Sequence, residues 1–289
     1  MAAPSIVMKF GGTTMQGPLK FGPDEDGLLD ECLRQSSVHD IYQLLAVRRN
    51  QARAQRLREI AKKFVLPAVT AESVPVVVVS AFDWATDKLA QFAATISASP
   101  VPREYARLLM SGELRANASL AMTLEDLGAR AQSLTGREAG IVTDGRPTRA
   151  LVERVEPDYV QSLVDRHVIP VVAGFQGYYW DEEWQRNEVS ILGRGGSNLT
   201  AVALAHYLGL PECTMFSDVD GVYDKDPNVH GSDAQKLDEV PAEELFTWPR
   251  FPQVIQKESV EFAVSKGVDI WIRDGNDPTR SGTVIRCRK

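Results

Sequence analysis

Two glycine-rich stretches of the chain combine residue types that are suited to binding phosphate. Residues 193–200 read GRGGSNLT, follow the apolar pair 191–192 and run directly into the apolar segment 201–205. This order predicts a strand, a glycine loop and the N-terminus of a helix, where unpaired N–H groups and the helix dipole attract anions. Residues 9–14 (KFGGTT) follow the apolar run 6–8 in the same way. Together with their lysine and arginine, the two junctions indicate phosphoryl-transfer chemistry on an α/β sheet.

The composition narrows the class of protein. A chain of 289 residues with 44% hydrophobic residues can form a large core, as one α/β domain or as two lobes. The net charge of -7 argues against a general nucleic-acid binder, which normally carries a basic face. Neither the histidines nor Cys32, Cys213 and Cys287 have metal-binding spacing, so we expect reduced thiols and no metal ligation by them. Residues 1–4 lead directly into a strand pattern, and no apolar run reaches about 20 residues, so we expect a cytoplasmic protein without signal peptide or membrane helix.

Patterns of strands and helices alternate along the chain. Buried strands are predicted at residues 5–10, 74–80, 129–134, 168–173, 213–217, 268–273 and 283–286. Helical patterns cover most of residues 24–66, and residues 86–96, 105–127, 198–208, 242–246 and 259–265. The polar and aromatic segment 178–189 predicts a hairpin or flap, and we interpret the arginines of helix 48–63 as a solvated face rather than a nucleic-acid surface. Strands that alternate with helices predict βαβ units and a largely parallel sheet.

Seven segments, which occur in order along the chain, are similar to motifs of one protein family. They are residues 9–13 (KFGGT), 79–81 (VSA) with 86–87 (TD), 111–113 (SGE), 170–175 (PVVAGF), 193–197 (GRGGS), 217–223 (SDVDGVY) with 226–227 (DP), and 282–285 (GTVI). On these motifs the chain resembles the amino-acid kinase family, and within it the catalytic domain of aspartokinases. The resemblance implies an α/β fold, a three-layer αβα sandwich with a largely parallel central sheet, also described as carbamate-kinase-like. It implies one catalytic domain over residues 1–289, with an amino-acid-substrate lobe over about 1–195 and a nucleotide-binding lobe over about 196–289.

The activity that the resemblance implies is ATP-dependent phosphorylation of the side-chain carboxylate of aspartate to 4-phosphoaspartate. A carboxylate is already a nucleophile at pH 7, so catalysis rests on positioning and on neutralising the charge of the transferred phosphoryl group. The expected ligands are ATP, Mg²⁺ on its phosphates and a small amino acid. We expect a homodimer with no nucleic-acid or membrane partner. Most aspartokinases continue into ACT regulatory domains where this sequence ends, so feedback through such domains is not expected.

The same resemblance assigns roles to individual residues. The catalytic set is Lys9, Gly12 and Asn198. The residues expected to contact the amino acid are Ser80, Thr86, Glu113, Arg194 and Ser197. Among these, Arg194 would clamp a carboxylate and Glu113 would pair with the α-ammonium group. The residues expected to bind ATP are Lys9, Gly11, Gly12, Thr13, Gly195, Gly196, Ser217, Asp218, Tyr223, Asp226 and Lys257. No residue is assigned to a metal, and we interpret Asp220 as a turn former because Asp-Gly is a common turn pair.

Two of the departures from the aspartokinase pattern put the substrate or the activity in question. Asn198 stands where the family carries an aspartate that orients or pairs with the lysine; asparagine keeps the hydrogen-bonding shape and loses the charge. Residues 251–257 read FPQVIQK in place of a GAKVLHP-like segment, with Gln253 at the position of its lysine, and Lys257 falls where acetylglutamate kinases place one. Two alternatives therefore stay open: a diverged kinase of another small amino or carboxylic acid in specialised metabolism, and a catalytically weak nucleotide-binding subunit. The retained Lys9 and Glu113 favour an active kinase of an α-amino dicarboxylate.

Overall fold

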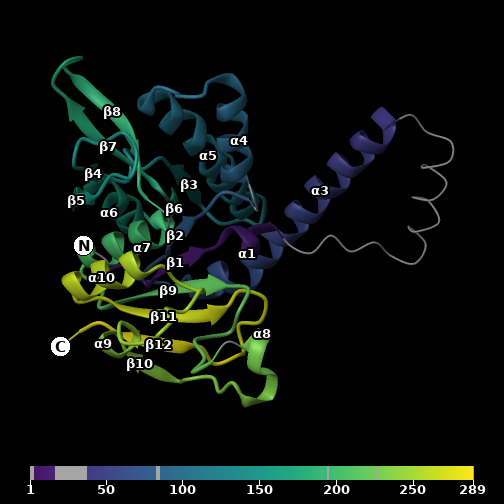
Figure 1. The fold of residues 1–289 in the computed structure, drawn as a ribbon, viewed down its shortest axis with the longest axis vertical. Helices are drawn as coiled ribbons and strands as arrows, with labels where there is room; N and C mark the ends of the chain where they lie inside the picture. Colours follow the sequence, from purple (N-terminus) through teal and green to yellow (C-terminus); the bar gives the residue numbers. More distant parts are fainter. Residues whose placement is uncertain (1–2, 17–37, 83–84, 194, 226, 289) are drawn as a thin grey trace.

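An eight-stranded sheet forms the centre of the molecule in the computed structural model, which describes residues 3–16, 38–82, 85–193, 195–225 and 227–288 (Figure 1). Its strand order is β10-β12-β11-β9-β1-β2-β6-β3. The strands span Val7–Phe10 (β1), Val76–Val79 (β2), Ala131–Leu134 (β3), Ile169–Ala173 (β6), Glu212–Ser217 (β9), Glu239–Pro241 (β10), Asp269–Asp274 (β11) and Thr283–Arg286 (β12). All neighbouring pairs are parallel except β11 with β12, so the predicted, largely parallel sheet is confirmed.

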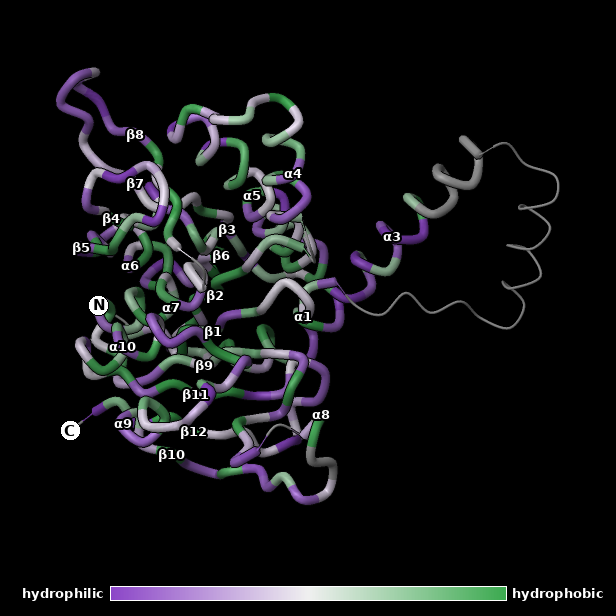
Figure 2. The backbone as a smooth tube through the Cα atoms, viewed as in Figure 1, coloured by the Kyte–Doolittle hydropathy of each residue, from purple (hydrophilic) through white to green (hydrophobic). Residues whose placement is uncertain are grey.

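Helices cover both faces of this sheet. The four consecutive valines of β2 are all 0% exposed, which requires cover on both sides because successive side chains of a strand point to opposite faces. Helix α5 (Pro102–Asp126) packs against β2, β6 and β3, and helix α7 (Gly196–Tyr207) packs against β1, β2 and β9. Figure 2 shows the hydrophobic positions gathered along the central strands. The layered architecture expected from the sequence is therefore confirmed.

Only some of the remaining helices of the described residues were predicted from the sequence. They are α1 (Gly12–Gln16), α3 (Val38–Ile60), α4 (Ala85–Ile96), α6 (Asp158–Asp165), α8 (Pro227–His230), α9 (Ala242–Leu245) and α10 (Lys257–Lys266). A π-turn at Ala61–Val65 and two 3-10 turns, at Leu66–Ala68 and Gly231–Asp233, complete the helical elements of the described residues. Residues 24–37 of the predicted helix 24–66 lie outside the described residues. Helices α6 and α8, the short helix α1, and strand β10 were not among the predicted elements.

A second, four-stranded sheet has the order β5-β4-β7-β8. Its strands are β4 (Ile141–Thr143), β5 (Val152–Val155), β7 (Gln176–Asp181) and β8 (Arg186–Ile191). Strands β7 and β8 pair antiparallel from Gln176–Ile191 to Asp181–Arg186, so the predicted hairpin is confirmed, and it projects from the body (Figure 1). Neither β4 nor β5 was predicted to be a strand. These segments have three and four residues, too few for a period of two to stand out.

Arg56 corrects the interpretation of the arginine-rich helix as a wholly solvated face. Its side chain is 3% exposed and lies near the end of α3. Its Nε donates to the carbonyl of Thr14 at 2.6 Å, its Nη2 to the carbonyl of Gly275 at 2.5 Å, and its Nη1 lies 3.2 Å from Glu59 Oε2. The guanidinium therefore joins α3 to α1 and to the end of β11, two segments that border the carboxyl edge of the sheet.

Replacing Arg56 with methionine is expected to lower the free energy of unfolding by about 2–4 kcal/mol, because two buried carbonyl oxygens lose their donors. Urea unfolding of wild type and variant measures the difference. Arg49→Met, on an exposed position of the same helix, is the matched control and should change stability by less than about 0.5 kcal/mol. Equal effects of the two substitutions would contradict the role assigned to Arg56.

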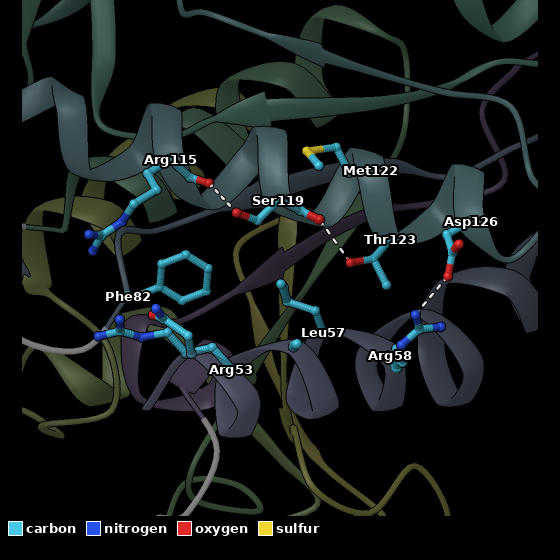
Figure 3. A pocket seen from close by; sticks show the side chains of 11 residues that line it. Arg53, Leu57, Arg58, Phe82, Arg115, Ser119, Met122, Thr123 and Asp126 are labelled. Atoms are coloured by element: carbon cyan, nitrogen blue, oxygen red, sulfur yellow. Dashed lines mark hydrogen bonds and ion pairs between the residues drawn. The ribbon is translucent and has the colours of Figure 1, made fainter. Parts of the chain in front are cut away.

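A groove of about 520 Å³ lies between α3 and α5 (Figure 3). Phe82 lies at its side, with the guanidinium carbons of Arg53 and Arg115 at 5.3 and 5.6 Å from the ring centroid. Arg58 and Asp126 form an ion pair of 2.7 Å that joins the two helices. None of the described residues to which the sequence analysis assigned a role lines this groove, so the candidate site has to be sought at the sheet itself.

Candidate active site

The carboxyl ends of five neighbouring strands meet at one edge of the central sheet. The N–H groups that follow four of these strands each donate to the carbonyl of a residue at the end of a neighbouring strand. The bonds are Gly11 to Phe216 (3.3 Å), Ser80 to Phe10 (3.2 Å), Gly174 to Val79 (3.0 Å) and Gly275 to Ser217 (2.7 Å). Ligands of parallel α/β sheets bind outside this edge. The structure thus brings the predicted segments 9–14, 80 and 217–218 together, although they are far apart in the sequence.

Lys9 lies at this edge, one residue before the end of β1. Its ammonium group lies close to the glycine turn: a Cβ atom built on Gly11 would be 3.4 Å from Lys9 Nζ. Burial lowers the pKa of Lys9 from 10.5 to about 8, and the nearby Asp218 carboxylate opposes that shift. A partly desolvated ammonium is a strong point charge for a phosphoryl group, since the local dielectric is low.

The glycine turn after β1 is fixed by the neighbouring strand ends. Helix α1 begins at Gly12, and the hydroxyl of Thr14 donates to the Phe216 carbonyl at 3.4 Å. Gly275 has no room for a side chain, because a Cβ there would overlap the Thr14 methyl group. No role was predicted for Thr14 or for Gly275. Both contacts depend on positions more than 200 residues away along the chain, which no local pattern reveals.

The second glycine loop begins helix α7 next to the end of β6. Gly195 adopts a left-handed conformation, φ 75° and ψ 10°, and precedes the first residue of the helix. Ser197 packs so closely on Gly174 that a Cβ on the glycine would lie 2.7 Å from Ser197 Cβ. The predicted loop-to-helix junction is therefore present at the sheet edge. Arg194, expected to clamp a carboxylate, lies outside the described residues.

Two of the four loop amides expected to face phosphate have partners within the chain. Gly11 donates to Phe216, as described above, and Gly196 donates to the carbonyl of Gly193 at 3.0 Å. Their N–H groups would have to exchange these bonds before they contact a ligand. Gly11 and Gly196 were both predicted to bind ATP, and contact of their N–H groups with phosphate requires this change of partners.

Glu113 lies beneath the end of β2, on helix α5. Its side chain is 3% exposed, and its Oε1 accepts the N–H of Ala81 at 3.3 Å. Its Oε2 is buried and has no hydrogen-bond partner among the described residues. Burial raises the pKa of Glu113 from 4.5 to about 7, although the Ala81 N–H acts in the opposite direction. A buried carboxylate with one free oxygen is suited to pair with a cationic group of a ligand.

Ser80 and Thr86 belong to segments that pack close to the part of α5 that carries Glu113. Ser80 follows β2 directly, and Thr86 lies in the first turn of α4. The two helices meet closely here, because a Cβ on Gly112 would lie 2.9 Å from Ala81 Cβ and 3.8 Å from Ala85 Cβ. The small residues Gly112 and Ala81 thus allow the three predicted substrate contacts to lie near one another.

Asn198 and Gln256 form a hydrogen-bonded pair at the second glycine loop. Asn198 is 5% exposed, and its Nδ2 donates to Gln256 Oε1 at 2.8 Å. Asn198 Oδ1 is buried and lacks a hydrogen-bond partner in the part of the chain that the structure describes. Gln256 had no role in the sequence analysis, although it belongs to the departing segment 251–257. Its partner lies 58 residues earlier, so sequence alone did not reveal the contact.

The side chain of Lys257, the neighbour of Gln256, lies against Glu261 and the Phe246 ring. Its side chain is 53% exposed, its Nζ lies 3.8 Å from Glu261 Oε1, and it also lies 5.7 Å from the centroid of the Phe246 ring. These contacts hold the ammonium along helix α10 rather than at the glycine loop. An ATP-binding role for Lys257 therefore requires its side chain to change partners.

The segment after β9 carries a polar network centred on Asp220. Tyr223 donates its hydroxyl to Asp220 Oδ1 at 2.9 Å, and Lys236 Nζ lies 3.4 Å from Asp220 Oδ2. Burial alone would raise the pKa of Asp220, but the Tyr223 hydrogen bond and the Lys236 charge lower it overall. Asp220 thus does more than form a turn, because it holds Tyr223 in place. Ser217 donates to Asp218 at 3.0 Å, and Asp226 lies outside the described residues.

Two properties of the described residues bear on other functions. No group of three or more His, Cys, Asp or Glu side chains in them is arranged to hold a metal ion. Among the described helices, none is both long and apolar enough to cross a membrane.

Comparison with known proteins decides the family. The model of the amino acid kinase family matches residues 4–285. The chain belongs to the amino acid kinase family. An aspartokinase of Corynebacterium efficiens is 40% identical over 235 residues, which are 80% of this chain and 54% of that protein. The chain thus spans about half the length of the curated relatives it matches.

Solved structures of the amino acid kinase family share the fold. An aspartate kinase from Synechocystis has 28% identity and a TM-score of 0.69, over 97% of this chain and 40% of that one. Escherichia coli aspartokinase III, in complex with aspartate and ADP, has 19% identity and a TM-score of 0.67, over 98% of this chain and 65% of that one. The resemblance to aspartokinases that the motifs predicted is confirmed.

Proposed function

We propose that the chain binds ATP and aspartate at the carboxyl edge of its central sheet and transfers the γ-phosphoryl group to the aspartate side chain. The product is 4-phosphoaspartate, an acyl phosphate. The observation that carries the proposal is the placement of Lys9 and Glu113 at one sheet edge, in a chain that is 40% identical to an aspartokinase. The two side chains supply the charges that an amino acid and a migrating phosphoryl group need.

The substrate amino acid would be held near the end of β2. We assign the α-ammonium group to the free Oε2 of Glu113, because binding there would give a buried oxygen its missing partner. Ser80, Thr86 and Ser197 would supply hydroxyl contacts, and Arg194 would clamp the α-carboxylate. Pairing with the ammonium would also lower the pKa of Glu113, so that aspartate binds with release of a proton near pH 7.

The phosphates of ATP would lie between the two glycine loops. Lys9 would neutralise charge on the transferred group, and Gly12, Gly195 and the start of α7 would donate N–H groups to its oxygens. We place the nucleotide along Thr13, Gly11, Gly196, Ser217, Asp218, Tyr223 and Asp226, with Lys257 as a further candidate after a side-chain movement. The attacking carboxylate needs no general base, since it is ionised at pH 7.

Mg²⁺ fits the chemistry of this edge. Asp218 is an exposed carboxylate whose charge acts on Lys9, so it lies near the group that would face the phosphates. Magnesium usually takes one or two carboxylates and otherwise phosphate oxygens and water. Asp218 would hold it, and the cation would supply neutralisation of phosphate charge.

The proposal also includes the division of the chain into two lobes and its oligomeric state. We assign residues 1–195 to the side of the amino acid and residues 196–289 to the side of the nucleotide, since Glu113 lies in the first part and α7 and β9 in the second. We also propose a homodimer, on the resemblance alone, and sedimentation velocity over a range of concentrations tests it.

Acyl-phosphate formation, trapped with hydroxylamine in the presence of ATP and Mg²⁺, tests the function. We expect a signal with aspartate and none above background with glutamate or N-acetylglutamate, which are the matched controls for side-chain length and for the blocked amine. A signal only with another acid would overturn the choice of substrate. Binding of ATP without product over all acids would overturn the catalytic role of the chain.

A further inference from the structure

Two side chains from different helices meet at the start of α7. Asn198 comes from the first turn of α7, and Gln256 is the residue immediately before α10. The two helices lie side by side (Figure 1), and they pack against each other along their length. The contact between the amides, 2.8 Å from Asn198 Nδ2 to Gln256 Oε1, joins their N-termini at the second glycine loop.

The second glycine loop leaves space for the side chain of Gln256. A Cβ on Gly195 would overlap the Oε1 of Gln256, so a glycine at this position leaves the space that the amide occupies. The hydroxyl of Ser259, a residue that is 0% exposed, reaches the carbonyl of Gly195 at 3.5 Å. Two residues of one helix start therefore contact one residue of the loop. Gln256 has an extended backbone, φ -80° and ψ 141°, and its side chain makes no capping hydrogen bond to α10.

The pair fixes which atom of the Asn198 amide stays available. Because Nδ2 is engaged by Gln256, Oδ1 is the remaining polar atom, and it is buried without a partner among the described residues. A buried acceptor without a donor costs about 1–3 kcal/mol, so it indicates a partner that arrives with the ligands or by a movement of Lys9. An ammonium, as Lys9 carries, is a donor that such an acceptor would bind.

We infer that Gln256 is a positioning residue, which holds the Asn198 amide so that its Oδ1 stays available as a neutral acceptor for a donor that comes from the ligands or from a movement of Lys9. This inference rests on the proposed function. It gives the two departures from the aspartokinase pattern, Asn198 and segment 251–257, a single physical reason. An asparagine can serve here only if its NH₂ group is bound elsewhere, and Gln256 provides the oxygen that binds it.

A donor and acceptor series at position 256 tests the inference. Gln256→Glu keeps an oxygen toward Asn198 Nδ2 and should retain kcat within about threefold, whereas Gln256→Met removes it and should lower kcat about 10- to 100-fold. Gln256→Lys offers a donor, would turn the Asn198 amide around, and should lower kcat at least as much as methionine. KM for aspartate should change less than kcat throughout, because Glu113 and Thr86 lie on other elements than Gln256, although Ser197 is the neighbour of Asn198. Glu258→Met, an exposed position on the same helix, is the matched control.

The outcomes separate this inference from the proposed function. If wild type forms no acyl phosphate from aspartate, the proposed function fails, and exchange of the Asn198 side-chain NH₂ protons, measured by NMR, still tests the pairing. Slow exchange in wild type and Gln256→Glu, with fast exchange in Gln256→Met, supports the pairing. Equal exchange in all three, or loss of activity in Gln256→Glu equal to that in Gln256→Met, overturns the inference. Melting temperatures of the variants identify any loss that is due to unfolding.

Discussion

The Lys9→Met variant should form acyl phosphate at least about 100 times more slowly than wild type and yet be more stable at pH 7. The rate falls because the variant lacks the charge that neutralises the transferred phosphoryl group, and removal of one such group typically costs a factor of about 100 to 1000. Stability rises because methionine fills similar space without a desolvated charge. Replacement of a surface lysine would not lower the rate of acyl-phosphate formation and raise the stability at the same time.

The pH dependence of that stability difference follows from the pKa of Lys9. Folding lowers the pKa from 10.5 to about 8, so the folded state binds fewer protons than the unfolded state between these values. Wild type therefore gains stability as the pH rises from 8 to 10.5, and methionine abolishes this gain. The variant should be more stable by about 1–3 kcal/mol below pH 8, with the lower part of this range expected because Lys9 is partly exposed.

Urea unfolding at pH 7 and pH 10.5, together with the hydroxylamine assay, measures both effects. Lys62→Met, at an exposed position beyond α3, is the control and should leave rate and stability unchanged. The rate kcat/KM of wild type should also decline as the pH rises through about 8, where free Lys9 loses its proton. A Lys9→Met variant with near wild-type rate would refute the role of this lysine in phosphoryl transfer.

Local sequence patterns predicted the parts of the fold that depend on local order. The four valines of β2 indicate a strand buried on both faces, whatever its neighbours are. The glycine loop before α7 combines an apolar strand, glycines and a helix start within 15 residues, and the structure contains all three at residues 186–207. The order of the seven motifs then indicated one family, because several short matches are far more specific when they occur in the same order as in that family.

The remaining features depend on contacts between distant residues. Arg56 resembles its exposed neighbours in sequence, and only the carbonyls of Thr14 and Gly275 explain its burial. Gln256 lies in a segment that matches no motif, and its partner Asn198 is on another helix. Asp220 has the sequence of a turn, yet Tyr223 and Lys236 make it the centre of a network. A single sequence contains no record of these pairs.

The Glu113→Gln variant should bind aspartate about 100 times more weakly, as measured by KM, and should be more stable than wild type at pH 8. Glutamine keeps an oxygen for the N–H of Ala81 but offers no charge to an α-ammonium group. Glu125→Gln, at an exposed position of the same helix, is the control and should change neither quantity.

The sign of the stability effect follows from the raised pKa of Glu113. The folded pKa of about 7 lies above the ordinary value of 4.5, so the folded state binds the proton more tightly between these values. The contribution of Glu113 to stability is therefore fully present below pH 4.5 and is lost as the pH rises through about 7, where the buried carboxylate must ionise. Glutamine has no proton to lose, so the variant's advantage in free energy of unfolding should be absent near pH 4.5 and reach about 1–3 kcal/mol at pH 8.

Saturating aspartate should reverse this order of stabilities at pH 8, because its ammonium group stabilises the ionised glutamate and not the amide. If aspartate raised the melting temperature of both proteins equally, Glu113 would not be the residue that recognises the amino group.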